Sequence, residues 1–266
     1  MTESIDIASV ESFEEYIDLT ATQIDVFLSK TQRSDHFTTL FRGQENKTWR
    51  LLPKIGRAEY CSGGQDMEKI EQSILKEFKR LAYPFVSAAI EKQCDLCALA
   101  QHHGLPTRLL DWTLNPLAAL WFACINEKNN NQDRAVWRYF AFDEEDFMSE
   151  TDENNIIKIK TNKVFKPKHL SNRISSQYSW FTVHKLDDDH KFFLPLTAKD
   201  NSFNLQKIII QNASRDEMLN KLNVLGVNAF SLFPNLDGLC QYLDWIKFKC
   251  NFSMSLKDRK KLFSKT

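Results

Sequence analysis

The chain has 266 residues, with 35 Lys and Arg against 35 Asp and Glu, so its formal net charge is zero. A neutral total argues against a protein coated with basic residues for nucleic-acid binding. Only seven residues are glycine, and none lies in the glycine-rich motifs that cradle phosphate in dinucleotide-binding folds and P-loop enzymes. No apolar run approaches the roughly 20 residues that span a bilayer, and the acidic N-terminus lacks a signal-peptide pattern, so we expect a cytoplasmic protein that does not contact a membrane.

In chain order, the first predicted element is a helix within 10–30, where apolar residues recur at helical spacing. Residues 37–42 are β-branched and aromatic, which predicts a strand that ends at Arg42. Asp66 is placed to cap a helix over 67–79. This part of the chain therefore mixes helix and strand.

The middle of the chain predicts three short elements around a polar segment. A helix over 94–103 is stopped by Gly104, at the position that a helix C-terminus favours. A short strand follows over 108–112. Pro116 then stands in the first turn of an apolar helix over 117–126.

The rest of the chain continues this mixture. The remaining predicted strands cover 135–142, 181–184, 206–211 and 227–233. The remaining predicted helices cover 214–226, where Ser214 begins a capping-box pattern, and 236–248. Residues 143–170 are polar and poorly periodic, which predicts a loop or excursion. Because strands and helices alternate without a regular βαβ period, we expect an α+β fold, a mixed sheet with flanking helices.

The neutral total conceals segregated charge. Residues 1–29 contain seven acids and no Lys or Arg, whereas residues 154–186, here called the basic window, contain seven cations and no acid. The tail from Ile246 onward holds six Lys and one Arg against one Asp. Such runs are solvated faces or sites for an anion, either a phosphorylated ligand or a nucleic acid.

The densest group of polar residues lies at 101–116, where His, Thr, Arg, Asp, Gln and Trp stand between apolar stretches. Polar groups in such a setting need partners when they are buried. Two interpretations remain open: a structural network in which Arg108 pairs with Asp111, or an active site. Asn235 and Asp237, further along, are placed to cap the last helix.

Other chemistry has weaker signals. Cys94 and Cys97, followed by His102 and His103, provide four potential zinc ligands, but the cysteines lie in an apolar helical pattern without a second cysteine pair. We therefore expect no metal. The G-x-S-x-G motif of serine hydrolases is absent.

Four segments together resemble the FRG domain of bacterial proteins. In order they are LFRGQ, ALAQHHGLPTRLLDWTLNPLAALWFA, RISSQYSWFTVH and SLFPNLDGLCQYL. The resemblance covers about 35–245, preceded by an acidic helical lead-in at 1–34 and followed by a basic tail at 246–266. Ser179 stands where the family usually has Gly, and Asn235 where it usually has Asp. The resemblance implies an effector in conflict between bacteria and phages, a toxin or a phage-defence protein.

A second resemblance is to NAD-dependent ADP-ribosyltransferases of the Arg-Ser-Glu type, which implies an ADP-ribosyltransferase-like fold. Arg42 falls on the arginine that grips NAD, and 111–113 falls on the Ser-Thr-Ser triplet. The strand that carries the catalytic Glu falls in 172–181, which contains no acid. Either Asp111 or Asp237 supplies the negative charge, or the fold binds a nucleotide without this chemistry, or the comparison does not apply.

These arguments predict a site for NAD or a related nucleotide between Arg42, the 101–113 loop and the 173–181 strand. The residues expected to bind the ligand are Arg42, Gln101, Thr107, Arg108, Trp112 and Thr113. The residues expected to act in catalysis are His102, His103, Asp111 and Gln177.

Two alternatives remain. The first is a non-catalytic module that binds a protein encoded nearby, or binds nucleic acid through the basic window and the tail. The second is a hydrolase or nuclease that uses His102, His103 and Asp111. The sequence therefore leaves open whether the protein is an enzyme.

Overall fold

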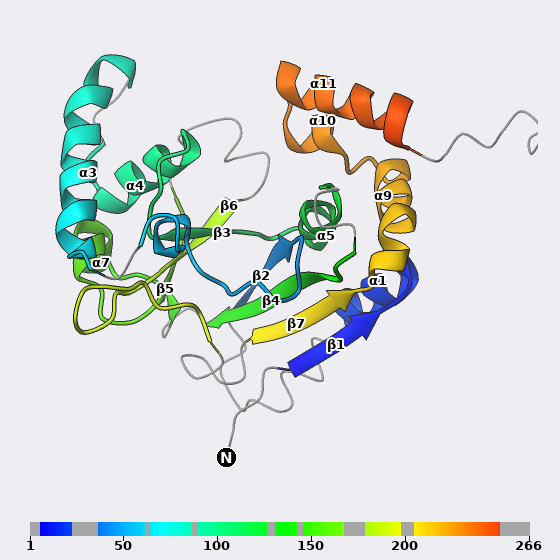
Figure 1. Ribbon diagram of the computed structural model, residues 1–266, viewed down its shortest axis with the longest axis horizontal. Coiled ribbons are helices and arrows are strands. Elements are labelled where there is room, and N and C mark those ends of the chain that lie inside the picture. The colour runs from blue at the N-terminus through cyan, green and yellow to red at the C-terminus, as the bar shows by residue number, and fades with distance from the viewer. Residues whose placement is uncertain are drawn as a thin grey trace, which may run out of the picture.

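The computed structural model describes residues 6–22, 37–61, 64–86, 90–126, 131–142, 146–167, 179–197 and 205–250. Its centre is a seven-stranded mixed sheet in the order β1-β7-β4-β2-β3-β6-β5 (Figure 1). The strands are β1 Asp6–Val10, β2 Phe37–Gln44, β3 Leu109–Thr113, β4 Arg134–Phe142, β5 Lys163–Phe165, β6 Ser179–Val183 and β7 Leu205–Ile210. β1 runs parallel to β7, and the other neighbours are antiparallel. The predicted α+β class is confirmed.

Helices flank both halves of this sheet. They are α1 Phe13–Thr22, α3 Met67–Ala82, α4 Gln93–His102, α5 Pro116–Cys124, α7 Glu150–Asn154, α9 Arg215–Val224, α10 Ala229–Leu232 and α11 Leu236–Asp244, which continues into a π-helical turn at Trp245–Lys249. α3 and α4 pack behind β3 and β6, whereas α1, α5 and α9 cover the other half (Figure 1). No helix in the described parts of the chain is long and apolar enough to cross a membrane.

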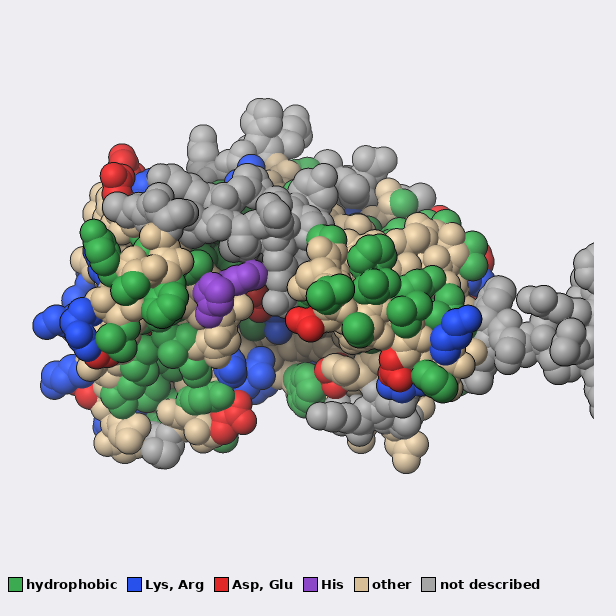
Figure 2. Space-filling model, turned by 90° about the horizontal axis from the view of Figure 1, so that it is seen from above, with side chains coloured by type: hydrophobic (Ala, Val, Ile, Leu, Met, Phe, Trp, Pro, Cys, Tyr) green, Lys and Arg blue, Asp and Glu red, His purple; other side chains and the backbone are tan. Residues whose placement is uncertain are grey.

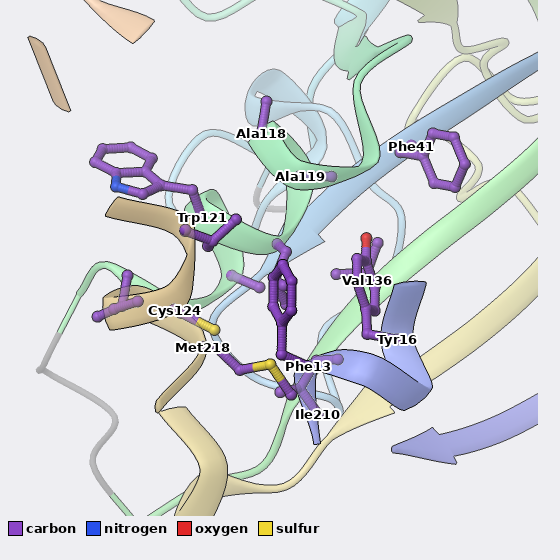
Figure 3. Close-up of a cluster of buried hydrophobic side chains, with 14 of the residues drawn as sticks. Phe13, Tyr16, Phe41, Ala118, Ala119, Trp121, Cys124, Val136, Ile210 and Met218 are labelled. Carbon is purple, nitrogen blue, oxygen red and sulfur yellow. The ribbon is translucent and has the colours of Figure 1, made fainter. Parts of the chain in front are cut away.

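The largest buried cluster joins α1, α5 and α9 to the strands beneath them (Figure 3). Phe13 and Tyr16 of α1 pack there with Trp121 of α5, Met218 of α9 and Ile210 of β7. Burial of such large side chains stabilises the fold by roughly 1.5–3 kcal/mol each. Residues 6–22, expected as a lead-in outside the main domain, thus supply a strand and a helix to the same sheet and core.

Strands β2 and β3 barely pair. β2 pairs with β4 along its whole length, and β3 pairs with β6 along its whole length, but β2 and β3 share the single register position Phe41–Thr113. The sheet therefore opens between these two strands. Beyond that position, the facing backbone N–H and C=O groups of β2 and β3 do not pair with each other. Buried backbone groups need hydrogen-bond partners, so side chains or a ligand can bond to them there.

Gly43 allows β2 to lie directly against α5. A Cβ atom at this position would lie 2.0 Å from the carbonyl oxygen of Ala119 and 2.6 Å from the amide nitrogen of Ala123. Any side chain would therefore push the helix away from the strand. Gly104 has a different role: its φ of 91° ends α4 as the sequence predicted.

Several predicted elements are confirmed by the structure. The strand at 37–42 is part of β2, and Asp66 caps α3 by accepting a hydrogen bond from the amide of Lys69. Asn115 caps α5 with Pro116 in its first turn, and Asn235 caps α11 through the amide of Gly238.

Three predictions about local structure are wrong. The strand expected at 227–233 is the helix α10, because Asn228 caps it through the amides of Phe230 and Ser231. Ser214 does not cap α9; its hydroxyl instead donates a hydrogen bond to the carbonyl of Glu11. The expected loop at 143–170 contains α7 and the edge strand β5.

Candidate ligand-binding cleft

A cleft of about 1220 Å³ lies where β2 and β3 separate. One side is formed by α4 and by residues 48–59, here called the β2–α3 segment, and the other by α5. Figure 2 shows this hollow between the two halves of the molecule, with histidine side chains at its edge. Its volume exceeds the roughly 300–1,000 Å³ of common small-molecule pockets, so it has room for a ligand of dinucleotide size.

Arg42 extends from β2 across the split to β3. Its Nη1 donates a hydrogen bond of 2.7 Å to the backbone carbonyl of Asp111 and lies 3.7 Å from that residue's carboxylate. Its side chain is 17% exposed, and its buried Nε has no hydrogen-bond partner among the described residues. Burial lowers the pKa of Arg42, the carboxylate of Asp111 opposes that shift, and the charge of Arg57 adds to it. Arg42 thus lines the cleft with its guanidinium anchored to β3.

Asp111 is held by a directional chain of hydrogen bonds from α4. The hydroxyl of Thr107 donates to Oε1 of Gln101, and Nε2 of Gln101 donates to Oδ1 of Asp111 at 2.8 Å. The amide of Leu109 donates to the Thr107 oxygen at 3.3 Å. Gln101 and Asp111 line the cleft, whereas Thr107 is buried beside it. The structure therefore brings Arg42, Gln101 and Asp111 together at the cleft.

The two histidines differ in position. His102, in the last turn of α4, lines the cleft that Asp111 also lines. His103 is exposed, and its ring centroid lies 5.0 Å from that of His102. His103 is not among the residues that line the cleft in the described parts of the chain. His102 alone is placed to meet a ligand there.

Arg108 does not reach the cleft. It is fully buried, and its Nε lies 2.9 Å from both carboxylate oxygens of Glu71 on α3. Its Nη1 donates to the carbonyl of Ile156 at 3.0 Å. The expected partner, Asp111, and the expected phosphate are thus both replaced by an internal ion pair. No sequence pattern linked Glu71 to Arg108, which lies 37 positions away.

Trp112 and Thr113 line the cleft, but both side chains are buried in its floor. Trp112 is buried, its Nε1 donates to the hydroxyl of Thr182 at 2.9 Å, and its ring packs 5.8 Å from that of Tyr139. Thr113 is buried and accepts a hydrogen bond from the amide of Asn115. Trp112 therefore has little surface for stacking on a ligand. Gln177 lies outside the described residues.

The β2–α3 segment supplies cleft residues that the sequence analysis did not single out. Trp49 is 46% exposed and lines the cleft with Arg50, Lys54 and Arg57. Lys54 donates to the carbonyl of Gly104 at 3.0 Å, which ties the segment to the end of α4. The signal in the sequence was a Trp-Arg pair and two further cations in a connection between a strand and a helix.

The charges around the cleft do not cancel in pairs. In the described part of the chain, three carboxylates line it, from Glu45, Glu59 and Asp111, against four cations. Within the described residues, neither Arg50 nor Arg57 has an ion-pair partner, and both are exposed. An anion with an aromatic ring matches unpaired guanidinium groups beside an exposed indole.

The alternative sites receive less support. Cys94 and Cys97 are buried on the core side of α4, and burial raises the pKa of both thiols, that of Cys94 to about 12. The described residues contain no group of three or more His, Cys, Asp or Glu that is arranged to hold a metal ion. In the basic window, Lys158 pairs with Glu68. Most of the tail and residues 168–178 lie outside the described residues.

Comparison with known proteins gives one match. No curated protein and no solved structure is significantly similar to the chain. The family model described as the FRG domain matches residues 38–132. Among the described residues, all that line the cleft lie within this stretch except Phe181 of β6. The chain therefore carries an FRG domain, and this domain builds nearly the whole cleft.

Proposed function

We propose that the cleft binds a nucleotide, with NAD as the ligand that fits its size and charge. The observation that carries this proposal is the pair of exposed arginines, Arg50 and Arg57, which lack ion-pair partners in the described chain beside the exposed ring of Trp49. Guanidinium groups bind phosphate by charge-assisted, bidentate hydrogen bonds, and an indole stacks on a base.

Arg42 is the third phosphate ligand in this proposal. Its anchoring to the backbone of β3 fixes the guanidinium at the point where the two strands separate. A ligand that bridges Arg42 and the β2–α3 segment spans the cleft from the sheet to its rim. No glycine-rich loop is needed, because side chains supply the donors that backbone amides supply in other nucleotide sites.

We extend the proposal to NAD consumption or ADP-ribosyl transfer. Cleavage of the nicotinamide–ribose bond produces a positively charged ribose, which a nearby carboxylate stabilises. The described strand β6 carries no acid, so the carboxylate would come from Glu45, Glu59 or Asp111. Release of nicotinamide from NAD, against a blank without protein, tests this extension.

The FRG domain supports a further proposal, that the protein is a toxin or a phage-defence effector whose activity depends on this cleft. Expression of the wild type and of Arg57→Ala in a bacterial host, with growth and phage plaques counted, tests it. If the wild type and Arg57→Ala change growth and plaque counts equally, the biological role does not depend on the cleft.

Calorimetric titration with NAD tests binding directly. We expect saturable binding by the wild type and a loss of affinity of about tenfold to a hundredfold in Arg50→Ala/Arg57→Ala, since a hydrogen bond to a charged group contributes about 1.5–3 kcal/mol. Arg80→Ala is the matched control, because Arg80 lies on α3, outside the cleft, paired with Glu77. Absence of binding by the wild type, or equal losses in both variants, would overturn the proposal.

A further inference from the structure

Asp111 has acceptor capacity that the described residues do not use. Its side chain is 62% exposed in the cleft. Gln101 donates one hydrogen bond to Oδ1, and Arg42 lies 3.7 Å from Oδ2, beyond hydrogen-bond distance. An ionised carboxylate offers about four acceptor positions and no donor, so most of these positions are open to a ligand.

We infer that Asp111 accepts hydrogen bonds from the 2′ and 3′ hydroxyls of the ribose of a bound nucleotide, so that the cleft selects ribonucleotides with an unmodified diol. This inference rests on the nucleotide site proposed above. A vicinal diol offers two donors, which match the two oxygens of a carboxylate, and acidic side chains recognise ribose in this way in other folds. The adjacency of Arg42 and Asp111 matches the order of groups in a nucleotide, where phosphate is attached to ribose.

The same carboxylate would reject two close analogues. A 2′-deoxyribose lacks one of the two hydroxyl donors. On binding, one carboxylate oxygen then loses its hydrogen bond with water and gains none from the sugar. A 2′-phosphate places a second negative charge beside Asp111, and like charges in contact at a binding site are strongly unfavourable. Specificity thus comes from one residue that attracts the correct sugar and repels the phosphorylated one.

Gln101 is a positioning residue in this arrangement. Its amide oxygen accepts from Thr107, which fixes the amide so that its NH₂ group faces Asp111. The Thr107 hydroxyl is itself oriented by the amide of Leu109, at the start of β3. The carboxylate is therefore held from α4 and needs no rearrangement to receive a diol.

Titration with AMP, 2′-deoxy-AMP and adenosine 2′,5′-bisphosphate tests the inference, because the last two differ from AMP only at the 2′ position. We expect the wild type to bind AMP at least tenfold more tightly than either analogue. Asp111→Asn should lower the preference over the bisphosphate at least tenfold. Asp237→Asn is the matched control, because Asp237 is an exposed acid on α11 that does not line the cleft. It should keep both preferences.

Gln101→Leu provides a second variant that leaves the charge of the cleft unchanged. It should reduce the preference for AMP over 2′-deoxy-AMP severalfold, because Asp111 loses its anchor. If the wild type binds neither NAD nor AMP, the proposed function is overturned. NAD binding together with equal affinities for the three AMP compounds, or no affinity for any of them, would overturn this inference alone. So would preferences that persist in folded Asp111→Asn.

Discussion

The cleft and the core behind β3 use arginine in opposite ways. In the core, Arg108 donates from Nε and Nη2 to the carboxylate of Glu71 and from Nη1 to carbonyl oxygens. In the cleft, Arg50 and Arg57 have no such partners within the described chain, and Arg42 has only a carbonyl and a distant carboxylate. Arg108 of the core directly precedes β3, and Asp111 of the cleft lies on β3, so three positions of sequence separate the two environments.

This difference shows how to read a cationic residue in a polar segment. A guanidinium that is fully buried and bonded to a carboxylate and to carbonyl oxygens, as that of Arg108 is, indicates a structural role. A guanidinium at the edge of a large cleft without a pair retains its capacity for an anion. Arg108, the more prominent residue in the sequence, belongs to the first kind, and the inconspicuous Arg57 belongs to the second.

The largest expected effect is on the core. Replacing Arg108 with Met leaves the carboxylate of Glu71 buried without a partner, so we expect a loss of about 3–5 kcal/mol in the free energy of unfolding. Chemical denaturation measures it. The double variant Arg108→Met/Glu71→Leu should recover part of this loss, because it removes the uncompensated charge.

The matched change in the cleft is Arg42→Met. It removes one hydrogen bond to the Asp111 carbonyl and a contact with its carboxylate, so we expect a loss of about 1 kcal/mol. Equal losses for Arg42→Met and Arg108→Met would show that the two regions do not differ in the way we describe.

A third prediction concerns pH and His184, whose side chain is fully buried. Burial lowers the pKa of His184 from 6.5 to about 4; the carbonyl of Leu194 opposes this shift, and the charges of Arg42 and Arg108 add to it. The unfolded chain therefore binds a proton near pH 6.5 that the folded chain does not accept until about pH 4. The stability from neutral His184 is complete above pH 6.5 and is lost as pH falls toward 4, by about 3 kcal/mol.

Denaturation of the wild type and of His184→Gln at pH 7.5 and pH 4.5 tests this linkage. The wild type should lose more stability than the variant over that interval. A difference between pH values that is the same in both proteins would assign the acid sensitivity to other groups.

Local patterns made most of the fold predictable. The cap at Asp66, the Asn-Pro start of α5 and the glycine at the end of α4 are each signalled by residues within one turn. The helix α10, where a strand was expected, also depends on a local cap, at Asn228, but other differences depend on contacts distant in sequence. β1 pairs with β7 across 200 positions, and Ser214 is taken from its capping role by Glu11, 203 positions away.

The site was predictable to the same degree. Arg42 and Asp111 meet because each lies on a strand beside the split in the sheet, and their polar character within apolar sequence marked them. The β2–α3 segment had no periodicity and no known motif, so its Trp-Arg pair and two further cations were a weak signal on their own. Their place at the cleft follows from the path of the chain, which only the tertiary structure gives.

The last prediction separates the role of Thr107 in positioning Gln101 from its contribution to stability. Thr107→Val keeps the shape of the side chain but removes the hydroxyl that orients Gln101, so we expect a loss of about 1 kcal/mol in stability. The freed amide can turn its oxygen toward the Asp111 carboxylate, which should reduce the preference for AMP over 2′-deoxy-AMP. Thr182→Val is the control, because its hydroxyl joins Trp112 to His184 within the core. Thr182→Val should lower stability by a similar amount yet leave that preference intact. A reduced preference for AMP in both variants would instead assign the change in Thr107→Val to a general loosening of the sheet.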